Sequence, residues 1–286
     1  MDLETTVLAM SELKPTVPVV TSEVYRVAKR PLRIHFVRPA VPTGADYPCV
    51  LFIQGCAFGA AGPQNLLQSA PQILYLVEQG FVVGSVEHTY SYEAPFPAAV
   101  QDVFEAVRYV KKHAQRLAVN CARIGVWGAS SGGNLAAMIG TAGMLNEFPG
   151  NIEDEDPSVR AVVDWFGPTD FLRMNEQGSQ QDHDSPDSPE SRYIGAPIQQ
   201  VPEKALKANP ITYLKPGVDY PSFLIMHGDQ DPLVPYGQSV LLYNALRQLG
   251  QDATLIRLVN EGHGTPGFSD ERILRLIVDF FRRHLA

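Results

Sequence analysis

The stretch Gly128-Ala129-Ser130-Ser131-Gly132-Gly133 constrains this 286-residue chain more than any other. It follows Arg123–Trp127, an apolar run typical of a buried parallel strand, and precedes Asn134–Gly140, which has helical composition. A Gly-x-Ser-x-Gly pattern at such a corner is typical of a nucleophile elbow, because the glycines let strand and helix pass closely while the serine hydroxyl is lifted off the sheet. The simpler interpretation, a flexible Gly-Ser loop, stays open until Ser130 has partners elsewhere.

The remaining pattern predicts one α/β domain. A chain of this length with 45% hydrophobic residues can bury one large core. Residues 23–39 favour an antiparallel edge hairpin, and alternating strands and helices then favour a mainly parallel, twisted sheet with helices on both faces. The expected strands are Cys49–Ile53, Phe81–Val86, Arg123–Trp127, Val159–Trp165, Phe223–His227 and Ala253–Leu258. The expected helices, besides the one after the elbow, are Ser69–Gln79, Pro97–Leu117, Tyr236–Leu249 and Asp270–His284.

Two segments depart from the alternation. Residues 1–22 contain two prolines and little periodicity, which favours a loosely ordered N-terminal arm. Residues 171–214 are too polar and too long for a simple connection between two strands. We expect them to form a lid-like insertion over the site, so that the chain is a single domain of residues 1–286.

Charge and cysteine usage narrow the classes of partner. The net charge of −8 argues against nucleic acid and anionic membranes, and no apolar run has the length of a membrane span. The three cysteines, Cys49, Cys56 and Cys121, are odd in number, lack CxxC spacing and lie in or beside apolar strand-like runs, which favours reduced thiols. Together with an acidic N-terminus unlike a signal peptide, this predicts a cytoplasmic protein. The sequence leaves homo-oligomerisation open.

Ser130 needs an acid and a base, and both follow it in the chain. The turn Gly228-Asp229-Gln230-Asp231-Pro232 comes directly after a predicted strand, where parallel sheets place their ligands. Asp231 is the preferred acid, but composition does not separate it from Asp229, which could instead cap the turn. The order serine, acid, histidine then favours His263, in a Gly-flanked loop after the last strand, as the base.

His183, in the polar insertion, is a less favoured candidate for the base than His263. The run Asp182-His183-Asp184 could suggest a metal site, but the sequence offers no second ligand cluster. We therefore expect neither a metal nor a cofactor.

With these motifs in place the chain resembles a known family. It is similar to α/β-hydrolase esterases related to hormone-sensitive lipase, and most closely to the bacterial group of bifunctional acetylxylan and feruloyl esterases. The matching segments are Phe96-Pro97 with Asp102, the elbow, Asp164–Asp170, His227–Pro235 and Gly262–Gly264. That family has His-Gly-Gly-Gly-Trp after the third strand. Here Gln54-Gly55-Cys56-Ala57-Phe58 stands in its place, with the histidine and two glycines replaced.

The resemblance implies the α/β-hydrolase fold with Ser130 as nucleophile, Asp231 as acid and His263 as base. It also implies an oxyanion hole made by the backbone N–H groups of Cys56, Ala57 and Ser131. The expected activity is that of a serine carboxylesterase acting on short-chain or aryl esters, with carbohydrate and feruloyl-type esters among the candidates. A prolyl-oligopeptidase-like serine peptidase and a non-catalytic ligand-binding protein on the same fold are the alternatives. Four aromatic residues are candidates to line the substrate pocket: Phe58, Trp165, Phe166 and Tyr193.

Overall fold

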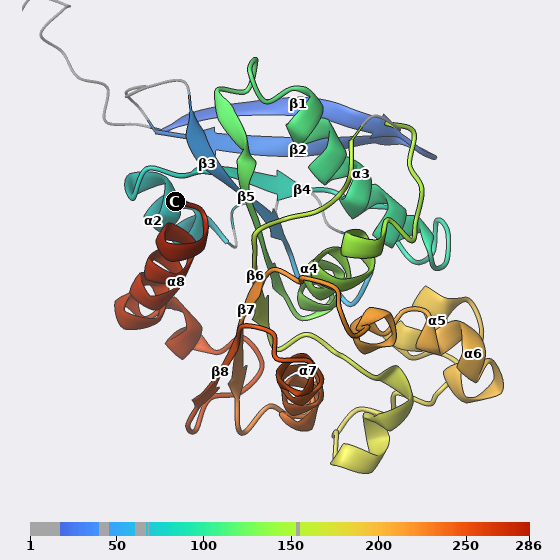
Figure 1. Ribbon diagram of the computed structural model, residues 1–286. Helices are drawn as coiled ribbons and strands as arrows, with labels where there is room; N and C mark the ends of the chain where they lie inside the picture. The colour runs from blue at the N-terminus through green and yellow to red at the C-terminus, as the bar shows by residue number, and fades with distance from the viewer. Residues whose placement is uncertain (1–17, 40–45, 61–66, 68, 153–154) are drawn as a thin grey trace, which may run out of the picture.

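The computed structural model describes residues 18–39, 46–60, 67, 69–152 and 155–286. In this part of the chain, eight strands form one sheet in the order β1-β2-β4-β3-β5-β6-β7-β8 (Figure 1). β2 pairs antiparallel with β1 and with β4, and every other neighbouring pair is parallel. The strands are β1 (Val19–Val27), β2 (Pro31–Arg38), β3 (Tyr47–Ile53), β4 (Val82–Val86), β5 (Val119–Ala129), β6 (Ala161–Trp165), β7 (Ser222–Gly228) and β8 (Ala253–Leu258).

Helices cover both faces of the sheet. Figure 1 shows α2 and α8 on one side and α3, α4 and α7 on the other, with α5 and α6 standing away from the sheet. The α-helices are α2 (Ala70–Glu78), α3 (Ala98–Lys112), α4 (Ser131–Thr141), α5 (Pro189–Ile194), α6 (Pro202–Leu206), α7 (Gly237–Gln248) and α8 (Glu271–His284). Single 3-10 turns are η2 (Ala142–Leu145), η3 (Phe171–Arg173), η4 (Asn175–Gln177), η5 (Ile198–Gln200), η6 (Pro210–Tyr213) and η7 (Pro266–Ser269).

The sheet separates two apolar cores, and β3 shows why. Leu51 and Ile53 belong to the core shared with α3 and α4, whereas Val50 and Phe52 belong to the core shared with α2 and α8. Successive strand residues point to opposite faces, so a strand buried on both faces must be continuously apolar. The predicted α/β architecture, a mainly parallel sheet with helices on both faces, is confirmed.

Several boundaries differ from the sequence prediction; β5, for example, begins at Val119 and not at Arg123. The helix expected to reach Leu117 ends at Lys112, although Leu117 is still buried and so keeps the apolar period of the helix beyond its end. The expected arm of residues 1–22 is too long, because residues 19–22 already belong to β1 and pair with β2. The rest of that arm, residues 1–17, lies outside the described residues. No helix in the described part of the chain has both the length and the apolarity to cross a bilayer.

The topology gathers the sequence motifs at one edge. Ser130 follows β5, Asp231 follows β7 and His263 follows β8. Because parallel strands end at the same edge of a sheet, residues far apart in the chain meet there. The segment 171–214, placed between β6 and β7, folds into short helices beside this edge.

Candidate active site

Ser130 occupies a strained corner between β5 and α4. Its φ is +55° and its ψ is −125°, a conformation that side-chain-bearing residues rarely adopt. Its N–H donates to the Trp165 carbonyl oxygen over 2.8 Å, which fixes the corner to β6. A Cβ atom at Gly128 would collide with the Gly132 carbonyl, and one at Gly132 with the Ile53 carbonyl. The glycines of the motif are therefore required by close backbone approach.

A hydrogen-bonded chain links the three residues that the sequence grouped. His263 Nε2 lies 3.0 Å from Ser130 Oγ, and His263 Nδ1 lies 2.7 Å from Asp231 Oδ2. An ionised carboxylate only accepts hydrogen bonds, so Nδ1 carries a proton and the neutral ring presents its lone pair at Nε2. The imidazole is thus set to accept a proton from the serine hydroxyl.

The Asp231 carboxylate is held ionised although its side chain is buried. Burial opposes ionisation, but hydrogen bonds from His227 and His263 outweigh it and keep the pKa of Asp231 well below its usual range. Its second oxygen, Oδ1, accepts the N–H groups of Leu233 at 2.9 Å and Val234 at 3.0 Å. These donors lock the carboxylate plane toward His263.

The two carboxylates of the β7 turn have different surroundings. Asp229 accepts the Asn260 N–H over 2.8 Å and lies 3.6 Å from the Arg257 guanidinium. Its carboxylate thus holds the turn after β8 at Asn260, and does not cap its own turn, which was the alternative role considered for it. Among the described residues, Asp231 is the acid that contacts His263.

The loop after β3 passes directly over Ser130. A Cβ at Gly55 would lie 2.8 Å from Ser130 Cβ and 2.6 Å from the Ala129 carbonyl oxygen, so this retained glycine of the motif has no substitute. Ala57 and Phe58 have φ values of +52° and +57°. Ala57 stands where the family has a glycine, and glycine would adopt this conformation without strain, so this replacement strains the loop.

The three residues predicted to supply the oxyanion donors, Cys56, Ala57 and Ser131, line the same cavity as Ser130, and a side chain holds one of the donors. The Cys56 N–H donates to Ser131 Oγ over 3.0 Å, so a side chain holds this donor. Sequence analysis considered only the backbone of Ser131 and missed its hydroxyl. Since the interaction joins two segments 75 residues apart, no local pattern signalled it.

A cavity of about 320 Å³ opens above Ser130 and His263. Phe58 and Phe166 line it, as predicted from the sequence, but the expected contacts from Trp165 and Tyr193 are corrected. Trp165 packs against Trp127 and Phe268 in the core, and the Tyr193 ring stacks on Phe58 at 3.9 Å from behind the wall. Both are large aromatic residues, and only packing shows which aromatic side chains face the cavity.

The insertion supplies the other part of the cavity wall. Gln181, His183, Pro189 and Glu190 line it, and sequence analysis gave none of them a role in binding. His183 was considered only as an outsider base or a metal ligand. Among the described residues there is no group of three side chains suited to hold a metal ion. His183 instead pairs with Glu190, as described below.

Residues 36–246 match the family model described as BD-FAE. The chain belongs to the BD-FAE family. Its α/β-hydrolase fold is shared with a solved structure described as a truncated carbohydrate esterase from gut microbiota, at 31% identity and a TM-score of 0.83, covering 96% of this chain and 98% of that one.

Two further relatives are larger proteins. The solved bifunctional GH43-CE protein of Bacteroides eggerthii is 30% identical with a TM-score of 0.78, covering 89% of this chain and 36% of that one. Esterase LipQ of Mycobacterium tuberculosis is 26% identical over 215 residues, which is 74% of this chain and 49% of LipQ. The chain spans about half the length of the first curated relatives it matches, 48% and 49%.

Proposed function

We propose that this protein is a serine carboxylesterase with Ser130 as nucleophile, His263 as base and Asp231 as acid. The observation that carries the proposal is the continuous hydrogen-bonded chain from Asp231 through His263 to Ser130 at the floor of the cavity. Membership of an esterase family supports ester hydrolysis over peptide hydrolysis and over inert binding.

The first half-reaction acylates Ser130. His263 Nε2 removes the hydroxyl proton while Oγ attacks the ester carbonyl, and the carbonyl oxygen becomes an oxyanion. The Ala57 and Ser131 N–H groups donate to that oxygen, and the Cys56 N–H joins them once it exchanges the Ser131 hydroxyl for the oxyanion. His263 then passes its proton to the departing alkoxide, so the alcohol leaves and the acyl group stays on Oγ.

The second half-reaction returns the free serine. His263 takes a proton from water, the resulting hydroxide adds to the acyl carbon, and the C–O bond to Ser130 breaks as His263 protonates Oγ. Asp231 stays ionised throughout and stabilises the imidazolium that forms twice in each cycle. Removing one oxyanion donor typically lowers kcat about 10²–10³-fold. The placement of the N–H groups in the altered loop should therefore strongly affect kcat.

The cavity supports short-chain or aryl acyl groups. The rings of Phe58 and Phe166 flank the space above Ser130, and about 320 Å³ is enough for a small ester. The carbohydrate esterases among the relatives make acetylated or feruloylated sugars the first natural candidates.

Hydrolysis of p-nitrophenyl acetate, butyrate and octanoate tests the proposal. We expect turnover by the wild type that falls at least about a thousandfold in Ser130→Ala and His263→Ala, with acetate or butyrate as the best substrate. The matched control is His284→Ala, a half-buried histidine at the end of α8 that does not line the cavity and should keep wild-type rates. Equal rates in the wild type and the two site variants, or no turnover at all, would contradict it.

A further inference from the structure

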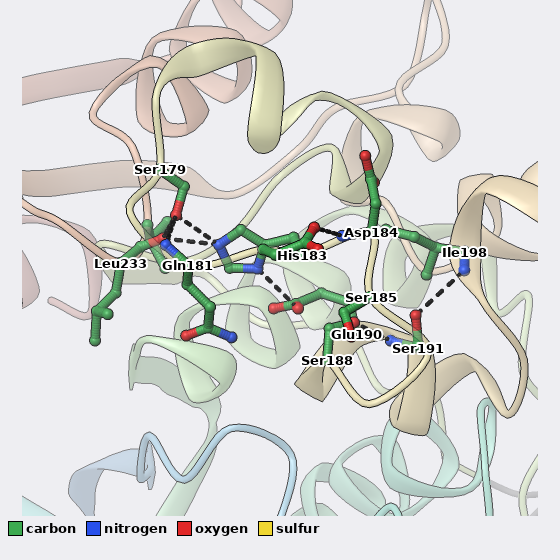
Figure 2. A network of polar contacts seen from close by, with 12 residues as sticks. Ser179, Gln181, His183, Asp184, Ser185, Ser188, Glu190, Ser191, Ile198 and Leu233 are labelled. Carbon is green, nitrogen blue, oxygen red and sulfur yellow. Dashed lines mark hydrogen bonds and ion pairs between the residues drawn. The ribbon is translucent and has the colours of Figure 1, made fainter.

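The insertion carries a buried acid–base pair that the mechanism does not use. His183 and Glu190 are only 2% and 4% exposed, yet both line the cavity. His183 Nδ1 lies 2.8 Å from Glu190 Oε2 (Figure 2). Burying a carboxylate and an imidazole is costly, so a pair held at the wall of a binding cavity calls for an explanation.

The hydrogen bonds around His183 fix where its protons are. Ser179 Oγ donates its hydrogen to the Leu233 carbonyl oxygen over 2.7 Å, and His183 Nε2 lies 2.9 Å from both of these oxygens. Since the carbonyl only accepts and the hydroxyl hydrogen is already used, Nε2 must carry a proton. One further proton is then shared between Nδ1 and Glu190.

The surroundings of the pair favour that proton on the imidazole. Burial opposes a charged ring, but the hydrogen bond to Glu190 and the charge of that carboxylate prevail and raise the pKa of His183. The two side chains thus form an imidazolium–carboxylate pair whose net charge is zero. The pair is also anchored, because Leu233 belongs to the loop that holds Asp231 in place.

One oxygen of the pair is left over. His183 occupies Glu190 Oε2, and no donor in the described part of the chain reaches Oε1. The Gln181 amide also lines the cavity and makes no side-chain hydrogen bond within the same described residues. Figure 2 shows the Gln181 amide and the Glu190 carboxylate extending to the same side of the His183 ring. The cavity wall therefore offers a fixed, strong acceptor and an amide that can both donate and accept.

We propose that Glu190 Oε1 and the Gln181 amide form a subsite that binds a hydroxyl group of the ester substrate. The inference rests on the proposed function and names its substrate class: esters that carry a free hydroxyl near the scissile bond. A lone carboxylate would favour a cation, but the positive charge of His183 neutralises this one, so its free oxygen is best matched by a neutral O–H donor. His183 and Ser179 act as positioning residues that keep the carboxylate in place.

Two acetate esters that differ by one hydroxyl test the subsite: cyclohexyl acetate and trans-2-hydroxycyclohexyl acetate. We expect the wild type to prefer the hydroxylated ester in kcat/KM by about tenfold or more, the usual strength of a charge-assisted hydrogen bond. Glu190→Met should bring the preference to within about twofold by slowing the hydroxylated ester alone. Glu190→Gln keeps an uncharged acceptor, so its preference should lie between those of the wild type and Glu190→Met. Gln181→Leu should lower the preference several-fold.

The control is Asp187→Asn, an exposed acid on the same insertion that does not line the cavity and should leave the preference unchanged. No preference in the wild type, or equal slowing of both esters by Glu190→Met and Gln181→Leu, would overturn the subsite while leaving the esterase intact. If Glu190→Met does not fold, Glu190→Gln and Gln181→Leu carry the decision. A preference above about tenfold for acetylcholine over uncharged 3,3-dimethylbutyl acetate would replace the hydroxyl by a cation and also overturn it.

Saturation-transfer NMR on Ser130→Ala separates the two proposals if the wild type hydrolyses neither ester. Selective contact with 2-hydroxycyclohexyl acetate that is lost when Glu190→Met is added would support the subsite and leave only the esterase activity refuted. Absence of contact with either ester would overturn both.

Discussion

The cavity has two unlike walls. The reaction wall is made of the elbow and the loops with Gly55 and His263. It is fixed by the backbone, because Gly55, Gly128 and Gly132 have no room for a Cβ and Ser130 is held at a positive φ. The insertion wall, made of Gln181, His183, Pro189 and Glu190, is fixed by side chains that hydrogen-bond each other and the Asp231 loop. Backbone constraints leave a readable trace in sequence, whereas side-chain pairing across an irregular segment leaves none.

The largest effect should come from Asp231→Asn on the reaction wall. An amide would donate to His263 Nδ1 and stabilise the tautomer whose Nε2 carries a proton, so the ring could no longer accept one from Ser130. We expect kcat to fall about 10³–10⁴-fold at neutral pH in steady-state assays with p-nitrophenyl acetate. Asp229→Asn, two residues away, should change kcat less than about twofold, and a similar loss in both would contradict the assignment.

Gly55→Ala should be the next most damaging change. Its new Cβ would lie 2.8 Å from Ser130 Cβ, so the loop or the elbow must shift. We expect loss of about 1–3 kcal/mol of unfolding free energy in urea denaturation and at least about a hundredfold loss in kcat/KM. Gly143→Ala, where a Cβ would be 3.4 Å from its nearest neighbour, is the control. A fully active Gly55→Ala enzyme would show that this wall is not fixed by close approach.

The reaction wall should also make folding sensitive to pH through Asp164, which lies behind the elbow. Burial raises the pKa of Asp164 to about 7, against a smaller lowering by the Gly167 N–H. The unfolded chain ionises this group near pH 4, so the folded state binds more protons between about pH 4 and 7 and stability falls as pH rises through that window. Asp164→Asn should remove this fall.

Urea unfolding at about pH 4.5, 6 and 7.5 measures the effect of Asp164→Asn. The free energy of unfolding of the wild type should decrease relative to that of the variant across the series. Asp279→Asn, an exposed acid on α8, should follow the wild type. Parallel curves for the wild type and Asp164→Asn would rule out the raised pKa.

On the insertion wall, Ser179→Ala should have a milder and different effect. It removes the hydroxyl that bonds Leu233 and His183 but touches no reacting group. We expect KM for 2-hydroxycyclohexyl acetate to rise about two- to fivefold while kcat stays within about twofold, since only positioning is lost. Ser185→Ala on the same insertion should match the wild type. A large drop in kcat would mean that the two walls are not separable.

Ala57→Gly should have the smallest effect. Removing Cβ at φ +52° relieves about 1–2 kcal/mol of strain. Glycine loses more backbone entropy on folding than alanine, which offsets about 0.5–1 kcal/mol of this gain. We expect a Tm increase of at most a few degrees by calorimetry, with kcat within about twofold. Ala118→Gly, also at φ +52° but not lining the cavity, should give the same Tm change. A lower Tm in both variants would show that the positive φ carries no strain.

The sequence allowed most of the reaction wall to be predicted. Strand patterns placed Ser130, Asp231 and His263 at strand ends, and parallel pairing brings strand ends together whatever the details. Trp165 and Tyr193 were misplaced as substrate contacts because burial behind a wall and exposure on it use the same residue types. The pairing of His183 with Glu190 was missed for a related reason: a polar, Pro-rich segment has no period from which to infer partners.

Labelling with diethyl p-nitrophenyl phosphate, followed by peptide mass spectrometry, tests most directly whether Ser130 is the nucleophile. The predicted result is one diethylphosphoryl group on Ser130 with stoichiometric release of p-nitrophenol, lost in Ser130→Ala and kept in Ser131→Ala. Label on Ser131 or on another residue, or no label on a folded wild-type protein, would contradict the proposed mechanism.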